Sequence, residues 1–242
     1  LIRHRIRMQR ELALQGERIS AGQALTEERL RFYTNVTHEL RTPLTAIRGY
    51  AEGLSSGVIR DVKASASIIM EHSDKMSALV DELLYTSKLD AHMEVEGNET
   101  FDLRETVGHS LWELKEKFER ADLRLDLQFP DEKVLILGSE KLLERAVSNI
   151  LSNATRYAKT EIAVSLAATA GQAILTVTDD GDGISPEDLP HIFERFYKGR
   201  GGVSGLGLSI TQEAVRRHGG TVTAASAEGH TVFTVSLPVQ SA

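Results

Sequence analysis

The sequence predicts an α+β protein of two domains, a helical hairpin that dimerises into a four-helix bundle and an α/β sandwich with one open sheet. Two observations predict this fold class. Apolar residues recur at helical spacing through the first ninety residues, and after Gly97-Asn98 helical and strand-like segments are mixed. The 242 residues suffice for two modest domains. We expect an N-terminal helix or linker at 1–27, the hairpin at 28–96 and the sandwich at 97–242.

The first ninety residues contain two expected helices. The first runs from about 5 to 56, although Gly16 and Gly22 each weaken it by up to about 1 kcal/mol. Ser55-Ser56-Gly57 marks a turn, and a second helix follows over 61–90. Its apolar residues Ile69, Met76 and Leu83 are seven apart, and Leu79 and Val80 lie between them, a spacing typical of helices that pack nearly parallel. Two helices cannot enclose a core, so we expect pairing with a second copy; the alternative is docking on the rest of the chain.

The second domain should mix helices and strands. The expected elements are a helix over 104–120, strands at 124–129 and 134–137, a helix over 139–157 with Ser139 as its N-cap, strands at 161–166 and 173–178, a helix ending at His218, and a closing strand pair at 221–225 and 231–237.

Composition excludes several classes of function. The formal charge of −7 argues against bulk nucleic-acid binding, and the lack of cysteine excludes disulfides and thiolate metal sites. No apolar run approaches the roughly 18 residues of a membrane span. Arginines nevertheless crowd the first ten residues, at Arg3, Arg5, Arg7 and Arg10, as they do on the cytoplasmic flank of a transmembrane helix. The solvated face of a helix would explain them equally well.

The most informative segment is His38-Glu39-Leu40-Arg41-Thr42-Pro43-Leu44 in the first helix. The apolar stripe of that helix steps by three and four residues through Val36, Leu40, Leu44, Ile47, Ala51 and Leu54. His38 falls off this stripe beside Thr42, so it should face solvent or a partner. Taken alone, a solvated surface histidine is the commoner explanation.

Three elements of the second domain suggest a nucleotide site. Asn149 and Asn153 share a helix face, with Arg156 and Tyr157 following. Asp179-Asp180-Gly181-Asp182-Gly183-Ile184 follows a strand, where an aspartate can accept a hydrogen bond from an exocyclic amine, although a turn or calcium loop is as consistent with this element alone. Gly199 to Leu208 is a glycine-rich loop that opens a helix, an arrangement suited to phosphates. It lacks the P-loop ending and the context of a Rossmann fingerprint.

With these motifs the chain resembles the cytoplasmic catalytic core of a sensor histidine kinase of two-component signalling. His38–Leu44 matches the phosphoacceptor box, Asn149–Tyr157 the N box, Asp179–Gly183 the first glycine box, Phe193–Phe196 the phenylalanine box and Gly205–Gly207 the second glycine box. The resemblance covers roughly residues 28 to 238, with all five motifs in family order. It implies a dimerisation and histidine phosphotransfer domain at 28–96 and a catalytic ATP-binding domain of the GHKL (Bergerat) fold at 97–242.

The resemblance implies that His38 takes the γ-phosphoryl group of ATP and passes it to an aspartate of a response regulator. Glu39 would accept a hydrogen bond from the imidazole and act as base, because the ring can attack through one nitrogen only when the other carries the proton. Thr42 would orient water for dephosphorylation of the regulator. Pro43 should let the helix bend at the site.

The implied cofactors are ATP and Mg²⁺, with Asn153 carrying the metal ion. The remaining implied nucleotide contacts come from the N box, the two glycine boxes and the lid over 194–204: Asn149, Arg156, Tyr157, Asp179, Gly181, Gly183, Ile184, Phe196, Lys198, Ser204, Gly205, Leu206, Gly207 and Leu208. Implied partners are a cognate response regulator and a second copy of the chain, without nucleic acid. The full-length protein is expected to be anchored in a bacterial inner or plasma membrane upstream of Leu1, with this chain as its cytoplasmic portion.

Three functions remain in competition: a bifunctional kinase and phosphatase, a phosphatase-biased or scaffold protein, and a gyrase-like ATPase. Gyrase-like and chaperone ATPases carry a glutamate where Asn149 stands, and an asparagine cannot act as a general base at neutral pH, which favours transfer to a histidine. The lid is short and rich in glycine. Asp180 departs from the family pattern, where asparagine is common, and the sequence offers no account of it.

Overall fold

The computed structural model describes residues 30–90, 97–199, 205–227 and 229–240, with the side chains of 89 and 90 excepted. The chain divides into two compact units, Leu1–Val80 and Asp81–Ala242, and each is described by itself. The expected first helix lies outside the described residues over 5–29, and so does the arginine cluster. No helix of the described part is both long enough and apolar enough to cross a membrane.

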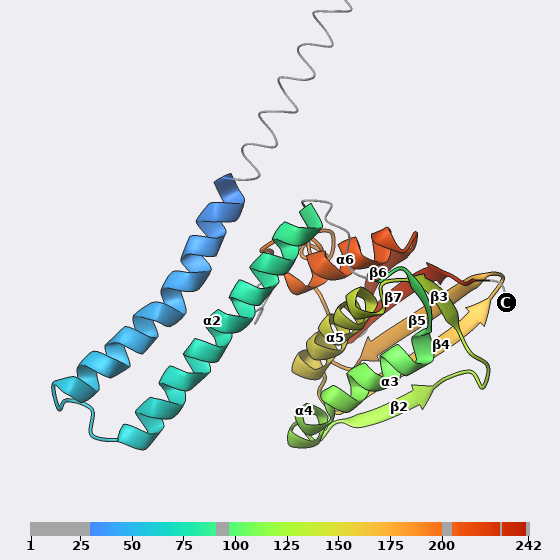
Figure 1. Ribbon diagram of the computed structural model, residues 1–242. Helices are drawn as coiled ribbons and strands as arrows, with labels where there is room; N and C mark the ends of the chain where they lie inside the picture. Colours follow the sequence, from blue (N-terminus) through green and yellow to red (C-terminus); the bar gives the residue numbers. More distant parts are fainter. Residues whose placement is uncertain (1–29, 91–96, 200–204, 228, 241–242) are drawn as a thin grey trace, which may run out of the picture. The chain divides into compact units, whose positions relative to one another are not determined.

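The first unit contains a helical hairpin (Figure 1). The first helix is continuous over 30–55, through Pro43, and the chain turns at 56–57, where Gly57 adopts a φ of +71°. The second helix, α2, spans Val62–Asp90, and the carboxylate of Asp61 caps its start by accepting the Ala64 N–H at 2.9 Å. The predicted hairpin and its turn are therefore confirmed.

The apolar stripe of the first helix differs from the prediction at two positions. Leu44 is 54% exposed and Ala51 is also exposed, whereas Pro43 is buried and Leu40 and Ile47 are partly buried. The covered face thus includes Pro43 instead of Leu44, although both lie at helical spacing from Leu40 and Ile47. On α2, Leu79 is buried and Val80 is exposed.

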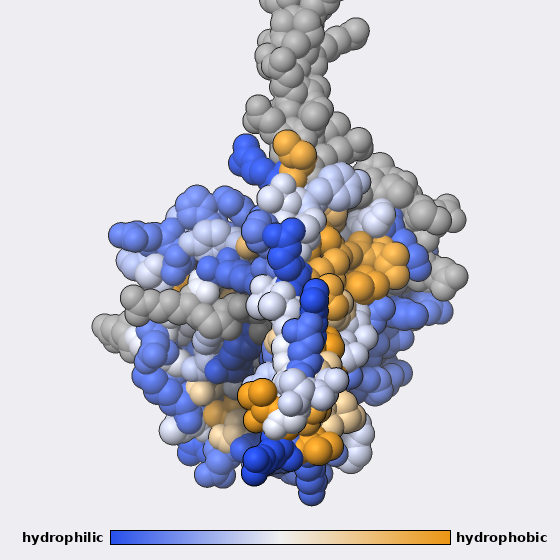
Figure 2. Space-filling view, turned by 90° about the vertical axis from the view of Figure 1, so that its left-hand side faces the viewer, coloured by the Kyte–Doolittle hydropathy of each residue, from blue (hydrophilic) through white to orange (hydrophobic). Residues whose placement is uncertain are grey.

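Large apolar side chains remain exposed along the hairpin. Figure 2, which views the left-hand side of Figure 1, shows apolar surface beside a polar strip. The exposed apolar residues of this unit are Leu30, Tyr33, Leu44, Val58, Val62, Met70 and Val80. Exposed apolar side chains of this size are typical of a surface that associates with another protein.

The second unit contains two sheets rather than the single open sheet predicted. The larger sheet has the order β2-β4-β5-β7-β6, with β2 (Arg124–Gln128) parallel to β4 (Glu161–Thr169) and the other pairs antiparallel. Its remaining strands are β5 (Gln172–Asp179), β6 (Thr221–Ala227) and β7 (His230–Pro238). A separate two-stranded sheet pairs β1 (Glu99–Asp102) with β3 (Leu135–Gly138). β1 was not predicted, because its four residues Glu-Thr-Phe-Asp carry no period-2 apolar pattern.

Helices cover one face of the five-stranded sheet (Figure 1). They are α3 (Leu103–Glu113), α4 (Lys115–Arg120), α5 (Glu140–Tyr157) and α6 (Gly207–Arg217). The predicted helix over 104–120 is interrupted at Leu114, which lies outside both α3 and α4. The core lies between the helices and the sheet, and each large apolar side chain fully buried there contributes about 1.5–3 kcal/mol. It includes Leu103, Leu143, Ile150, Ile162, Val164, Leu175 and Val177.

The start of α5 departs from the expected capping. Ser139 occupies the N-cap position with extended backbone, as predicted, but its side chain forms no capping hydrogen bond. Its backbone N–H instead donates to Nε2 of His218 at 3.0 Å, which ties the start of α5 to the end of α6.

Candidate active site

The two asparagines of α5 lie at the edge of its buried face. Ala146, Ile150 and Ala154 are buried, whereas Asn149 and Asn153 are partly exposed one turn apart. The Asn149 amide donates from Nδ2 to the Gly207 carbonyl oxygen at 2.9 Å. The N box and the second glycine box, 58 residues apart in sequence, are therefore joined by a direct hydrogen bond.

Asp179 ends β5 and is 2% exposed. Burial raises the pKa of its carboxyl group. The Gly181 N–H donates to Oδ1 at 3.1 Å and partly offsets this rise in pKa. Gly181 has no room for a side chain, because a Cβ there would lie 2.5 Å from the Tyr157 carbonyl oxygen. The first glycine box thus packs directly against the end of α5. Its acidic acceptor, Asp179, is almost completely shielded from solvent.

Asp180 has a different role from its neighbour. Its carboxylate accepts the Lys159 N–H at 2.8 Å, the Thr160 N–H at 3.0 Å and the Thr160 hydroxyl. The Thr160 hydroxyl and these backbone groups hold the pKa of Asp180 well below its usual range. Asp180 therefore fastens the turn between α5 and β4 to the end of β5, which explains the second acid.

The rest of the first glycine box is held by β6. The Ile184 N–H donates to Oγ of Ser226 at 2.8 Å, and Gly183 adopts a φ of +80° with its Cα facing the same hydroxyl. The Ile184 side chain is partly buried against the core. Nothing in the local sequence signalled Ser226, since it lies 42 residues further along the chain.

The phenylalanine box and the second glycine box are in direct backbone contact. The Phe196 N–H donates to the Gly205 carbonyl oxygen at 2.8 Å. Phe196 and Gly205 adopt positive φ values of 63° and 70°, and a Cβ on Gly205 would lie 2.6 Å from the Phe196 carbonyl carbon. Phe193 packs against the core and Lys198 is exposed. Residues 200–204, which include Ser204 and half of the glycine-rich stretch, lie outside the described residues.

The N-terminus of α6 is suited to an anion. No acidic residue stands in its first turn, and Leu206 at the N-cap has no side-chain oxygen to cap the helix. Leu206 is fully buried, and Leu208 is partly buried against the core. Arg156 and Tyr157, at the end of α5, are both exposed.

Two further contacts shape this region without a signal in the sequence. Thr231 of β7 hydrogen-bonds the Asp179 carboxylate, and the Tyr197 hydroxyl donates to Oδ1 of Asp188 at 2.5 Å. Thr231 lies opposite Asp179 on β7, the neighbour of β5 in the sheet, although the two residues are far apart in sequence.

The histidine of the hairpin lies on the exposed side of the first helix, as predicted. His38 and Thr42 are both exposed, and the Thr42 hydroxyl donates to the His38 carbonyl oxygen at 3.3 Å. Glu39 is partly buried. A solvent-facing imidazole and a hydroxyl one turn away are thus available together to a partner molecule.

Residues 28–92 match the His Kinase A (phospho-acceptor) domain, and residues 138–241 match the family described as histidine kinase-, DNA gyrase B-, and HSP90-like ATPase. The chain belongs to the sensor histidine kinases of two-component systems. It is 37% identical over 224 residues to the sensor histidine kinase TrcS of Mycobacterium tuberculosis and 33% identical over 223 residues to the sensor protein SrrB of Staphylococcus aureus. Each match covers 86% of this chain but only 43% and 37%, respectively, of the relative.

Solved histidine kinases share the fold. The histidine kinase AdeS of Acinetobacter baumannii superposes with a TM-score of 0.72 at 24% identity, over 84% of this chain and 98% of AdeS. The histidine kinase ThkA, solved in complex with the response regulator protein TrrA, gives 0.71 at 20% identity over 87% of this chain and 61% of ThkA. ShkA, solved in complex with AMPPNP, gives 0.66 at 22% identity over 86% of this chain and 46% of ShkA.

Proposed function

We propose that this sensor histidine kinase phosphorylates itself on His38 from ATP and passes the phosphoryl group to an aspartate of a response regulator. The observation that carries the proposal is the convergence of the nucleotide motifs. The hydrogen bond from Asn149 to Gly207 and the contact of Gly181 with Tyr157 bring the N box and both glycine boxes together. That convergence accompanies an exposed histidine in the hairpin of the same chain.

The residues present fit ATP and Mg²⁺. Asp179 would accept a hydrogen bond from the adenine amine, and the start of α6 would receive phosphate. Asn153, with Asn149 beside it, offers the oxygen donor that Mg²⁺ accepts. When bound, the metal ion would neutralise phosphate charge. The complex of ShkA with AMPPNP supports a nucleotide as the ligand.

The proposed reaction forms a bond between a His38 ring nitrogen and the γ-phosphorus while the bond to the β-phosphate oxygen breaks and ADP leaves. Glu39 would accept the hydrogen bond of the other ring nitrogen and take its proton. Asn149, in place of a glutamate, supplies no base to activate water, which favours transfer to the imidazole.

The partner of phosphorylated His38 would be a response regulator, which would offer the aspartate to the exposed face that His38 shares with Thr42. The complex of ThkA with TrrA supports this class of partner. The exposed apolar side chains of the hairpin, Leu44 and Met70 among them, support a homodimer in which a second hairpin covers them. Anchoring upstream of Leu1, in a bacterial plasma membrane with this chain on the cytoplasmic side, rests on the arginine cluster and stays a prediction.

Incubation of the chain with γ-labelled ATP and Mg²⁺ tests the kinase proposal. We expect acid-labile, base-stable label on the protein, and we expect His38→Gln to abolish it while nucleotide binding is unchanged, because the nucleotide residues lie in the other unit. Release of phosphate without labelled protein would instead support the gyrase-like ATPase.

We also propose a phosphatase activity toward the regulator, in which Thr42 orients water. Thr42→Ala should leave the rate of autophosphorylation within about twofold, since the exposed hydroxyl contacts only the His38 carbonyl among the recorded hydrogen bonds of the described residues. Dephosphorylation of the phosphorylated regulator should slow by about tenfold or more. Equal loss of both activities would refute this division of roles.

A further inference from the structure

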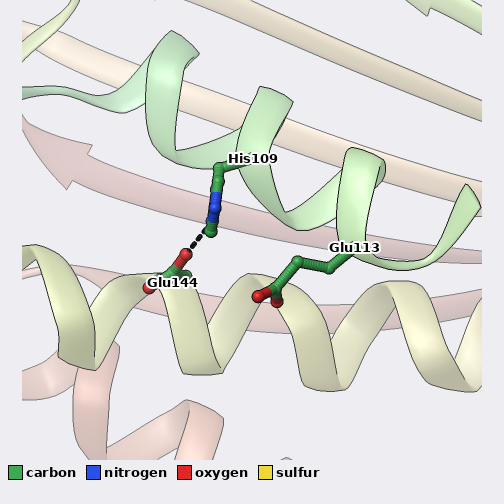
Figure 3. A group of neighbouring side chains, drawn as sticks. All are labelled: His109, Glu113 and Glu144. Atoms are coloured by element: carbon green, nitrogen blue, oxygen red, sulfur yellow. Dashed lines mark hydrogen bonds and ion pairs between the residues drawn. The ribbon is translucent and has the colours of Figure 1, made fainter.

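Three metal-ligating side chains converge between α3 and α5, away from the nucleotide motifs. His109 and Glu113 are four residues apart and share one face of α3, and Glu144 rises toward them from α5 (Figure 3). Nδ1 of His109 hydrogen-bonds a carboxylate oxygen of Glu144. One ligand atom from each of the three residues lies within 4.8 Å of the others.

The surroundings of this cluster are acidic. His109 and Glu144 line a hollow of about 630 Å³ together with Glu99, Glu140 and one cation, Lys141. Glu140 is held in place by the Thr106 hydroxyl, which donates to it at 3.1 Å. Within the described part of the chain, the recorded ion pair of Glu144 is to His109, and none is recorded for Glu113 or Glu140. Several carboxylates therefore face one small region with little positive charge to balance them.

We propose that His109, Glu113 and Glu144 bind a divalent first-row transition-metal ion of the Zn²⁺ type. An imidazole nitrogen with two carboxylates is a donor set that Zn²⁺ accepts, whereas Mg²⁺ and Ca²⁺ favour oxygen donors alone. Tetrahedral Zn²⁺ with ligand bonds of about 2.1 Å separates its ligand atoms by about 3.4 Å. The ligand atoms of the three residues already lie within 4.8 Å of one another, and the His109 side chain, 59% exposed, would exchange its hydrogen bond with Glu144 for a bond to the ion. Water would complete the coordination.

A bound ion would join α3 to α5, the helix that carries the nucleotide asparagines. α3 follows β1 directly, and Asn149 and Asn153 lie further along α5 on another face. Because the ion would bind the folded unit and not the separated helices, it should stabilise that unit against unfolding. The inference is independent of the proposed kinase reaction.

The test is a titration of the full chain with Zn²⁺ alone, in which calorimetry and fluorescence measure the binding of the ion. Trp112, the only tryptophan, lies in the same helix one turn from His109 and is 70% exposed, so its emission reports on the site. We expect one Zn²⁺ per chain at this site, a higher thermal unfolding midpoint, and neither effect with Mg²⁺. His109→Ala and Glu113→Gln should each weaken Zn²⁺ binding at least tenfold.

A matched control separates a three-ligand site from an ordinary histidine–glutamate pair. His191 and Glu194 form such an exposed pair, 2.7 Å apart, so His191→Ala should leave the affinity for Zn²⁺ and the Trp112 signal unchanged. Glu113 is exposed and its replacement by glutamine is isosteric, so this variant keeps the fold and provides the decisive measurement. Absence of Zn²⁺ binding, or binding that Glu113→Gln and His109→Ala leave intact, would overturn the proposal.

Discussion

Two adjacent aspartates of the first glycine box have opposite environments. Asp179 is buried at the end of β5, and burial raises the pKa of its carboxyl group. Asp180 is bound by the Thr160 hydroxyl and by two backbone N–H groups, which lower its pKa. The hydrogen bonds of Asp180 thus go to the turn between α5 and β4, whereas Asp179 is the acid that we propose as the ligand's acceptor.

Asp179→Asn should therefore weaken the binding of Mg²⁺–ATP by at least tenfold, because the amide replaces a charged acceptor with a partial donor. The fold should not suffer. A raised pKa in the folded state means that the carboxyl group favours folding only below its unfolded pKa of about 3.9, and this contribution is lost as pH rises through the folded value. The unfolding midpoint of Asp179→Asn at pH 7 should consequently equal or exceed that of the parent chain.

Calorimetric titration with Mg²⁺–ATP and thermal unfolding would measure both effects. The parent chain should also bind ATP more weakly as pH falls through the raised pKa of Asp179, whereas the variant should not. An unchanged affinity in Asp179→Asn would remove Asp179 from the nucleotide site.

The sequence was informative about residues whose neighbours are local. The position of Asp179 after a strand and before two glycines predicts that it accepts a hydrogen bond from a ligand, and this role stays a prediction. The role of Asp180 could not be predicted, because its partners Lys159 and Thr160 lie about twenty residues earlier and meet it only once β4 and β5 pair. Ser226 and Thr231 escaped prediction for the same reason.

At the scale of elements, the start of α3 depends on an ion pair between the buried Asp102 and the partly buried Arg104. Asp102 is 6% exposed and caps the helix by accepting the Arg104 N–H at 3.1 Å, and it also accepts the Val134 N–H at 3.1 Å. The Arg104 guanidinium reaches the carbonyl oxygens of Pro130 and Asp131. Asp102 thereby holds together β1, α3 and the connection into β3.

Asp102→Asn should lower the free energy of unfolding of this unit by about 2–3 kcal/mol, because it leaves Arg104 without its charged partner. Burial opposes ionisation of Asp102, but its hydrogen bonds with Arg104 and Val134 hold the pKa below its usual range. The stabilisation is therefore present above the unfolded pKa of about 3.9 and is lost as pH falls through the lowered value.

Urea unfolding at pH 7 and at pH 3 would show the effect, with a smaller difference between parent and variant at the lower pH. Glu116→Gln is the matched control, since its pair with Arg120 is exposed and should contribute less than about 0.5 kcal/mol. A loss in Asp102→Asn no larger than that of the control would contradict this account.

Prediction at this scale succeeded where the periodicity was long. Both hairpin helices, α5 and the strands of the large sheet agree with expectation, because each has enough residues to show a 3.6 or a 2.0 period. The prediction missed β1, which has only four residues. It also missed the interruption at Leu114, because the helical pattern of the sequence continues through this position. The apolar spacing of the sequence could not predict that Leu44 is exposed, because the neighbouring Pro43 occupies the covered face.

At the scale of the whole second unit, His218 connects three elements. It is 8% exposed, its Nδ1–H donates to the Ala214 carbonyl oxygen at 2.7 Å, and its Nε2 accepts the Ser139 N–H at 3.0 Å. The ring lies against Gly138, where any Cβ would collide with it. The end of α6, the end of β3 and the start of α5 are thus joined through one imidazole, whose hydrogen bonds require the neutral tautomer.

This arrangement makes the unit sensitive to acid. Burial lowers the pKa of His218, so the unfolded chain takes up a proton on this ring more readily than the folded chain does. The stabilisation from His218 is therefore fully present above the unfolded pKa of about 6.5 and is lost as pH falls from there through the lowered folded value. His218→Gln keeps an acceptor for Ser139 but cannot take up a proton.

Thermal unfolding followed by circular dichroism between pH 5 and pH 7.5 measures this dependence. The midpoint of the parent chain should fall with pH more steeply than that of His218→Gln, although the variant starts lower at pH 7.5 because its amide fits the ring-shaped site less well. All other histidines remain in both proteins, so the difference in slope belongs to His218. His191→Gln, which removes an exposed imidazole, should keep the parent slope. Parallel curves for the parent and His218→Gln would show that the buried imidazole does not couple folding to pH.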